Sequence, residues 1–304
     1  MTEPPLPGDT RFATNYPCLK FMVKNKGPLQ SSVVSPDWSN TKWWYATSDS
    51  TKAEVIAEIV PSTTFWKLLL SCRTLLQPLA RMIRKADTEG STYNSLVYYE
   101  MLLFQQHVAE HQGLPKPEHK QAQSLVLERW KFLHHPVHSA SYVLNPALMT
   151  REEDPLKDSE IRNDVAQVFE SFGGKEHAQT AKLQLQQFLM RCGEFADERL
   201  WTKESLALGG LNWFQAFCYE NSVLRDIALR VHSTPTVASA AERNWSVFGF
   251  VHSKSRNRLY GHKVEKLVYI YQNMRLLRKI RDPAFREPCV LPDHMFDEDE
   301  EEEE

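Results

Sequence analysis

Glu242 is the residue of this chain whose type and position most directly suggest chemistry. It ends the segment Ser239-Ala240-Ala241-Glu242, where an apolar pattern of helical period begins. A carboxylate on the first turn of a helix can bind a metal ion, but two-metal chemistry needs further acids that hold the ions about 4 Å apart. The same spacing fits a capping box, in which Ser239 and Glu242 bond the first backbone N–H groups of the helix. Both interpretations of Glu242 stay open.

Two other groups of side chains could bind a ligand. Arg129-Trp130 joins a cation to a large aromatic ring, a pair that suits a phosphate and an unpaired base. The alternative, which we favour, is a tryptophan packed between helices beside an arginine that reaches water. His134, His135 and His138 lie close together, but no cysteine or acid stands at zinc-ligand spacing. We therefore expect a solvated helix end there, with no metal and no cofactor.

Composition places the chain among folded proteins. Of its 304 residues, 42% are hydrophobic and 25% are charged, which excludes global disorder. The five cysteines are an odd number and widely scattered, which predicts reduced thiols and no structural zinc. No segment approaches the roughly 18 apolar residues of a membrane span, and the polar, proline-rich start is unlike a signal peptide. We expect no membrane association.

The formal net charge of −3 hides two opposed blocks. Residues 243–281 hold ten Lys or Arg and one acid, whereas residues 282–304 hold eleven acids and one Arg. The cations, including Lys254, Arg256 and Arg258, could contact phosphate in a salt-dependent way or could solvate the polar side of a helix. The acidic block is expected to be a disordered tail. Its charge suggests competition with nucleic acid for the basic block.

Apolar residues recur mostly at three- and four-residue steps, so the chain should be mainly α. Residues 11–26 have roughly helical spacing, 37–49 read as a short strand or a loop, 206–217 are less regular, and 223–232 fit a helix or a strand. Pro78 should kink or split the helix that contains it. The predicted helices cover residues 62–85, 92–112, 118–134, 138–144, 156–172, 176–191, 237–250 and 262–281.

The last of these helices carries an unusually wide apolar face. One side presents Val264, Leu267, Val268, Tyr271, Met274 and Leu277, and Tyr269 and Ile270 widen it further. A face of this kind can belong to an internal core. If part of it is exposed, it would be buried against a second copy in an isologous homodimer.

Several motifs here resemble a known family. The segments ERNWS (242–246), HSKSRNRL (252–259) and KLVYIYQNMRL (266–276) are similar to the C-terminal dimerisation region of hAT-superfamily (hobo/Activator-type) DNA transposases. Three upstream segments resemble other blocks of the family in the same order, so the resemblance spans roughly residues 11–281. They are RFATNYPCLKFMVKNK (11–26), FWKLLLSCRTLLQPLARMIRKAD (65–87) and ERWKFLHHPVHSASYVLNP (128–146).

The resemblance implies a ribonuclease H-like catalytic core interrupted by a large helical insertion, with an active site of two aspartates and one glutamate. Glu242 is similar to the third acid. Both aspartates should precede residue 11, where only Glu3 and Asp9 are acidic; Asp49 could mimic an acid at a strand end but lies beyond that pair. We therefore expect no DNA-cutting enzyme. The family's zinc-finger module is also expected to be missing.

The predicted fold is a truncated ribonuclease H-like core remnant with a large all-α insertion and a C-terminal helical dimerisation region. The dimer contacts implied are Trp245, Val264, Leu267, Val268, Tyr271, Met274 and Leu277. The predicted divisions are a disordered lead-in (1–10), the core remnant (11–60), the insertion (61–215), the last catalytic-core helix with the dimerisation region (216–281) and the acidic tail (282–304).

The sequence thus predicts a non-enzymatic dimerisation module derived from a domesticated hAT-type transposase. Its expected partners are a second copy or a full-length hAT transposase, with DNA as a further option. The alternatives are the C-terminal fragment of a DNA-cutting transposase from an incomplete gene model, and a non-specific DNA-binding protein. The resemblance implies a nuclear location; without it the default is cytoplasmic.

Overall fold

The computed structural model describes residues 5–6, 8, 14–40, 47–87, 93–149, 154–252 and 260–281. All regular structure within these residues is helical, which confirms the mainly α prediction. The ribonuclease H-like remnant predicted for residues 11–60 is not confirmed, because the described part of this range forms helices. They are α1 (Asn15–Lys24), α2 (Lys26–Val33), α3 (Pro36–Asn40) and α4 (Thr47–Ile59).

The strand or loop predicted for residues 37–49 is wrong wherever that range is described. Pro36 opens α3, a position where the missing N–H of proline costs nothing. Thr47 opens α4, whose Ala, Glu and Lys residues favour helix and outweigh the aromatic run before it. Asp49 consequently lies in a helix and is not an acid at the end of a strand.

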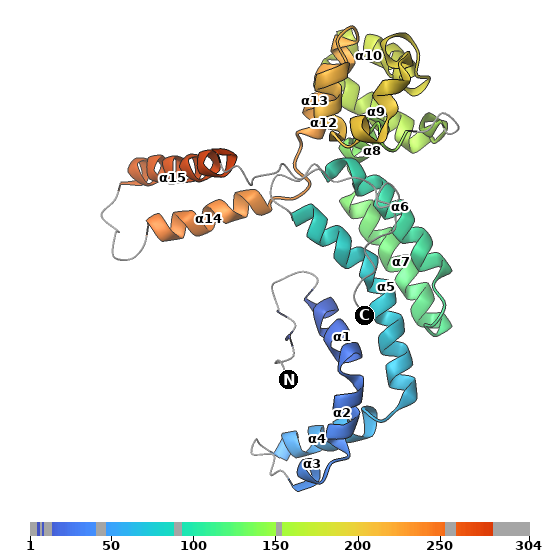
Figure 1. Ribbon diagram of the computed structural model, residues 1–304, viewed down its shortest axis with the longest axis vertical. Helices are drawn as coiled ribbons and strands as arrows, with labels where there is room; N and C mark the ends of the chain where they lie inside the picture. The colour runs from blue at the N-terminus through green and yellow to red at the C-terminus, as the bar shows by residue number, and fades with distance from the viewer. Residues whose placement is uncertain are drawn as a thin grey trace. The chain divides into compact units, whose positions relative to one another are not determined.

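The chain divides into two compact units, residues 1–84 with 100–133 and residues 85–99 with 134–304. The first unit contains α1–α4 and α7 (Lys116–Leu133), together with most of α5 (Thr63–Asp87) and α6 (Asn94–Glu110) (Figure 1). Pro78 lies inside α5, which continues through it as one helix, so the predicted split does not occur. The family-based divisions at residues 60 and 215 stay predictions.

A small apolar cluster holds the start of the first unit together. Val33, Val60, Trp66 and Leu69 are each at most 8% exposed and pack with partly buried neighbours from α1 and α2. The indole Nε1 of Trp66 donates a hydrogen bond to the Val60 carbonyl oxygen at 2.6 Å, so the buried ring keeps a polar partner. No single described helix is long and apolar enough to cross a membrane, although the bent pair Lys52–Ile59 and Thr63–Asp87 meets that test jointly.

The second unit contains a helical globule with an aromatic core. Phe188, Phe195, Trp213 and Phe214 are 0% exposed, and their rings pack edge to face or stacked. Residues 223–232, where the period left helix and strand open, are helical. The elements of the globule are α8 (Pro136–Val143), η1 (Pro155–Lys157), α9 (Ser159–Gly173), α10 (Lys175–Leu189), η2 (Gly193–Ala196), η3 (Glu198–Trp201), α11 (Lys203–Leu206), α12 (Gly209–Phe217) and α13 (Ser222–His232) (Figure 1).

The histidines before and within α8 make hydrogen bonds that stabilise this part of the fold. His135 is exposed, as expected for a solvated helix end, whereas His134 and His138 are partly buried. His135 Nδ1 accepts from the Val137 N–H, and His138 Nδ1 accepts from the His135 N–H, which caps α8. His134 Nε2 lies 2.8 Å from the Asp164 carboxylate. Burial, assisted by the neighbouring His134 and His135, lowers the pKa of His138 to about 4 and keeps it a neutral acceptor.

Candidate dimerisation interface

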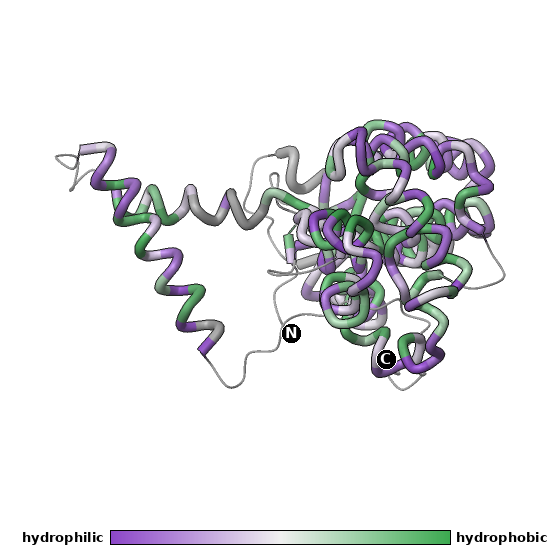
Figure 2. The backbone as a smooth tube through the Cα atoms, turned by 90° about the horizontal axis from the view of Figure 1, so that it is seen from above, coloured by the Kyte–Doolittle hydropathy of each residue, from purple (hydrophilic) through white to green (hydrophobic). Residues whose placement is uncertain are grey.

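Two helices, α14 (Ser239–Val251) and α15 (Gly261–Arg281), pack on each other. Their contact is small: Val251, Val264 and Val268 are 7%, 2% and 6% exposed, and Val247 lies partly buried against them. These residues lie close to the segment that connects the helices. Figure 2 shows the helices meeting near that segment and separating toward their other ends, so most of α15 is not covered by α14.

The rest of the apolar surface of this pair is open to solvent. On α15 the exposed large apolar side chains are Leu267, Tyr269, Ile270, Tyr271, Met274, Leu276 and Leu277, each between 44% and 70% exposed. On α14 they are Trp245, Phe248 and Phe250, at 78%, 41% and 65%. Exposed apolar area on this scale marks an interaction surface more often than a solvent face.

Helical geometry sorts these side chains into two sides of α15. A helix turns about 100° per residue, so Leu267, Ile270, Met274 and Leu277 form one continuous stripe beside Val264 and Val268. We call these four residues the α15 seam. Tyr271 borders the seam, and its ring centroid lies 6.2 Å from that of Phe250 on α14. Tyr269 and Leu276 lie about 130° around the helix from the centre of the seam, outside the stripe.

The seven predicted dimer contacts therefore fall into separate groups. Val264 and Val268 pack inside the hairpin of one chain, where they fix α15 against α14. Leu267, Tyr271, Met274 and Leu277 are 45–50% exposed and lie on or beside the seam, and Trp245 is exposed on α14. Ile270 and Phe250 were not among the predicted contacts. The three- and four-residue spacing identifies Ile270, whereas only the tertiary contact with Tyr271 identifies Phe250.

The structure does not support the capping box predicted at Ser239. The N-cap of α14 is Ala238, whose carbonyl oxygen accepts from the Glu242 N–H at 3.0 Å, and Ser239 is the first helical residue. Glu242 is solvent-exposed on the first turn. Among the described residues no group of three or more His, Cys, Asp or Glu could hold a metal ion. The catalytic role that the resemblance gives Glu242 stays a prediction.

Of the five predicted DNA contacts, the structure describes Arg129 and Trp130. Trp130 is 9% exposed, which leaves little of its ring for stacking on a base, while Arg129 beside it is exposed. Lys254, Arg256 and Arg258 lie outside the described residues. A nucleic-acid contact through these five residues stays a prediction.

Glu194 anchors the chain that leads into α13, within the same C-terminal region. Its carboxylate accepts from the backbone N–H groups of Tyr219, Glu220 and Asn221 at 2.8–2.9 Å and from the Asn221 side-chain amide at 2.6 Å. Burial alone would raise the pKa of this carboxyl group, but these hydrogen bonds outweigh burial and lower it. Nothing local in the sequence signals this anchor, because its partners lie 25–27 residues away.

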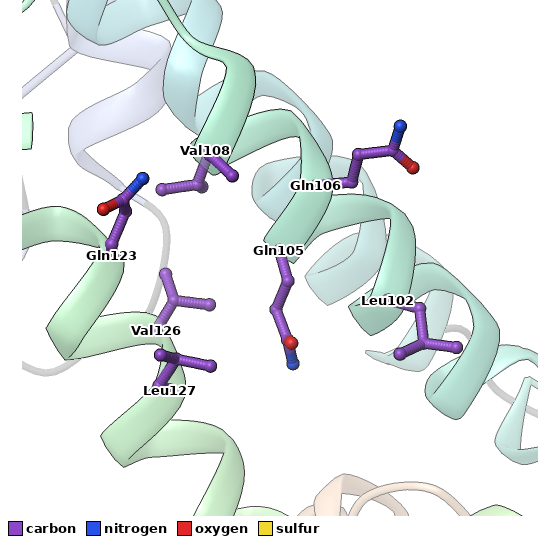
Figure 3. Close-up of a pocket in the computed structure, with 8 residues that line it drawn as sticks. Leu102, Gln105, Gln106, Val108, Gln123, Val126 and Leu127 are labelled. Atoms are coloured by element: carbon purple, nitrogen blue, oxygen red, sulfur yellow. The ribbon is translucent and has the colours of Figure 1, made fainter. Parts of the chain in front are cut away.

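A cavity of about 430 Å³ lies between α6 and α7 in the first unit. Figure 3 shows Val108, Gln105 and Val126 pointing into the space between the two helices. Its lining consists of aliphatic side chains and amides: Leu102, Gln105, Gln106, Val108, Ala109, Gln123, Val126 and Leu127. The lining contains no nucleophile and no titratable group, so these residues could not carry acid–base or covalent chemistry.

Ser71 and His111 form a hydroxyl–imidazole pair, with Oγ and Nε2 2.7 Å apart. Burial first, then the charges of His107 and His119, lower the pKa of His111. Ser71 is only 9% exposed, and a Cβ at Gly113 would lie 2.9 Å from its Oγ. The contact therefore ties α5 to the end of α6 beneath a closely packed backbone.

Comparison with known families identifies the C-terminal part of the chain. Residues 193–274 match the family model described as the hAT family C-terminal dimerisation region. The match begins at η2, includes Glu194 and α13, and ends at Met274 of the α15 seam. The chain matches none of the curated proteins and none of the solved structures with which it was compared. The resemblance inferred from the sequence motifs is confirmed for this region.

Proposed function

Because residues 193–274 carry the C-terminal dimerisation region of the hAT family, we propose that this protein is a homodimerisation module derived from an hAT transposase. The observation that supports the proposal is the uncovered apolar surface at the end of the matched region. The α15 seam is 45–51% exposed although its residues are as apolar as those of a core. A second copy that covers the seam would remove this surface from water.

The size of the seam sets how much its burial contributes to association. Fully burying a Leu, Ile or Met side chain contributes about 1.5–3 kcal/mol, so each half-exposed seam residue contributes roughly 1 kcal/mol. Four residues from each of two copies then give about 8 kcal/mol, which is comparable with the 4–15 kcal/mol lost on association. Burial of the seam alone therefore roughly offsets the cost of association, and the affinity of the dimer depends on the further apolar area that Phe250 and Tyr271 bury where they extend the seam.

The proposal has a wider form that rests on the family resemblance. A full-length hAT transposase with a matching dimerisation region would be a second partner, and pairing with it would interfere with transposition. We also propose a nuclear location and a role that does not include cutting DNA. Co-expression with a matching transposase, imaging of a tagged chain, and incubation with DNA and Mg²⁺ test these three points in turn.

The proposed homodimer is tested by the solution mass of the full chain. Light scattering across a concentration series from about 1 to 100 μM, which detects dissociation constants in the micromolar range, should show a mass that approaches twice the 35.3 kDa of one chain. A mass that stays at one chain throughout the series would overturn the proposal. Mass growth without a plateau would indicate open-ended association and would also contradict an isologous dimer.

A further inference from the structure

The α15 seam has an internal two-fold symmetry. Its members follow one another at spacings of three, four and three residues, the a/d pattern of a coiled coil. Lys263 stands four residues before Leu267, and Arg281 stands four residues after Leu277, so the pattern ends in a cation on both sides. Counted from Gln272 in either direction, an apolar seam residue stands two and five positions away, and a cation stands nine positions away.

This symmetry fits an antiparallel partner in one register. If two α15 helices lie antiparallel with Gln272 at the same height, Leu267 of one copy faces Leu277 of the other, and Ile270 faces Met274. Every apolar seam residue then meets an apolar residue. The two helix dipoles oppose each other in this arrangement, which is the favourable orientation for adjacent helices.

The contact between α14 and α15 favours the same orientation. α14 contacts α15 at Val264 and Val268 and, through Phe250, at Tyr271. The half of α15 that follows Tyr271 is therefore the half less covered by α14. Antiparallel pairing lays that half beside the partner's N-terminal half, where Phe250 extends the apolar surface next to Tyr271. Parallel pairing would instead place the C-terminal half of α15 against the C-terminal half of the partner's α15, so these less covered halves would contact only each other.

We propose that two copies of this chain associate through an antiparallel two-stranded coiled coil of α15, centred on Gln272 with Leu267 facing Leu277 of the second copy. The inference rests on the proposed homodimer and adds its interface and orientation. The pairing brings exposed cations together at both ends, Lys263 with Arg281 and Lys266 with Arg278. Salt screens such repulsion, so the dimer should tighten as salt is added, whereas phosphate binding weakens.

Disulfide trapping separates the two orientations. Leu267→Cys and Leu277→Cys are made as single variants of the full chain and oxidised alone or mixed. In the antiparallel register, positions 267 and 277 of different copies are adjacent, while identical positions are offset by ten residues, about 15 Å of helix rise. A disulfide needs Cα atoms within about 7 Å. Mass spectrometry identifies the linked peptides, so that disulfides of native cysteines are not counted.

The expected result is a 267–277 linkage in the mixture and no linkage at these positions in either variant alone. Linkage within each single variant would overturn the antiparallel orientation in favour of a parallel one. Tyr269→Cys and Leu276→Cys, outside the seam of α15, are the matched controls and should not link alone or together. If the unmodified chain is dimeric but neither orientation is trapped, this inference fails while the proposed function stands; if that chain is monomeric, both fail.

Discussion

His232 shows how a single buried side chain couples this fold to pH. It is 3% exposed at the end of α13, and its Nε2 lies 3.1 Å from the Leu144 carbonyl oxygen, to which a neutral ring can donate. Burial lowers its pKa to about 4, and the hydrogen bond to Leu144 only partly opposes this effect. The ring therefore stays neutral in the folded protein at pH values where the unfolded chain is protonated.

Stability should consequently fall as the pH drops from about 6.5 toward 4. In that window the unfolded chain takes up protons at His232 and His138 that the folded chain does not, which lowers the free energy of unfolding. For His232 alone the loss is roughly 3 kcal/mol over the whole window, of which about 2 kcal/mol falls between pH 7 and 5. Urea unfolding at pH 7.0, 6.0 and 5.0 measures it, and these values avoid the lower range in which Glu194 is protonated. An unfolding free energy that is constant between pH 7 and 5 would contradict the assignment.

At the scale of elements, the long periodic helices were the predictable part of this fold. The segments predicted at 92–112, 118–134 and 262–281 match α6, α7 and α15 to within about two residues at each end. In these segments apolar residues recur at helical spacing over several turns, so a few residues that do not fit the spacing do not obscure the pattern. The residues before 60 were predicted less well, because a cluster of aromatic residues suggested strand while packing against Trp66 stabilises short helices.

The sequence predicts that one side of α15 is apolar, but it does not predict how much of that side is buried within one chain. The period of α15 places Val264, Val268 and the seam on one broad surface and cannot tell which part α14 covers. That division depends on tertiary contacts at Val247 and Val251. The Glu194 anchor and the His232–Leu144 contact were equally hidden, since they join residues 25 to 88 positions apart.

The close approach of α12 and α13 gives a prediction for Gly210. A Cβ at this position would overlap the ring of His232, so Gly210→Ala should force the two helices apart. Overpacking of this kind costs about 1–3 kcal/mol of unfolding free energy, measurable as a lower urea midpoint. The control is Gly249→Ala in α14, where a Cβ would meet no atom within 4 Å. There alanine should be neutral or stabilising by helix propensity, and equal losses in the two variants would refute the steric account.

At the scale of the whole molecule, the central claim is that the chain associates through one side of α15. That claim is tested by two double variants with the same chemistry on different faces of the helix. Tyr271→Glu with Leu277→Glu places two charges on or beside the seam, and Tyr269→Glu with Leu276→Glu places them away from it. All four residues are at least 44% exposed, so neither pair should unfold the chain.

The most direct measurement is sedimentation velocity of the unmodified chain and both variants at the same concentrations. We predict that the Tyr271/Leu277 variant sediments as a folded monomer while the Tyr269/Leu276 variant remains dimeric like the unmodified chain. Circular dichroism confirms that both variants keep their helix content. Dimers in all three samples, or loss of the dimer only in the Tyr269/Leu276 variant, would contradict the account.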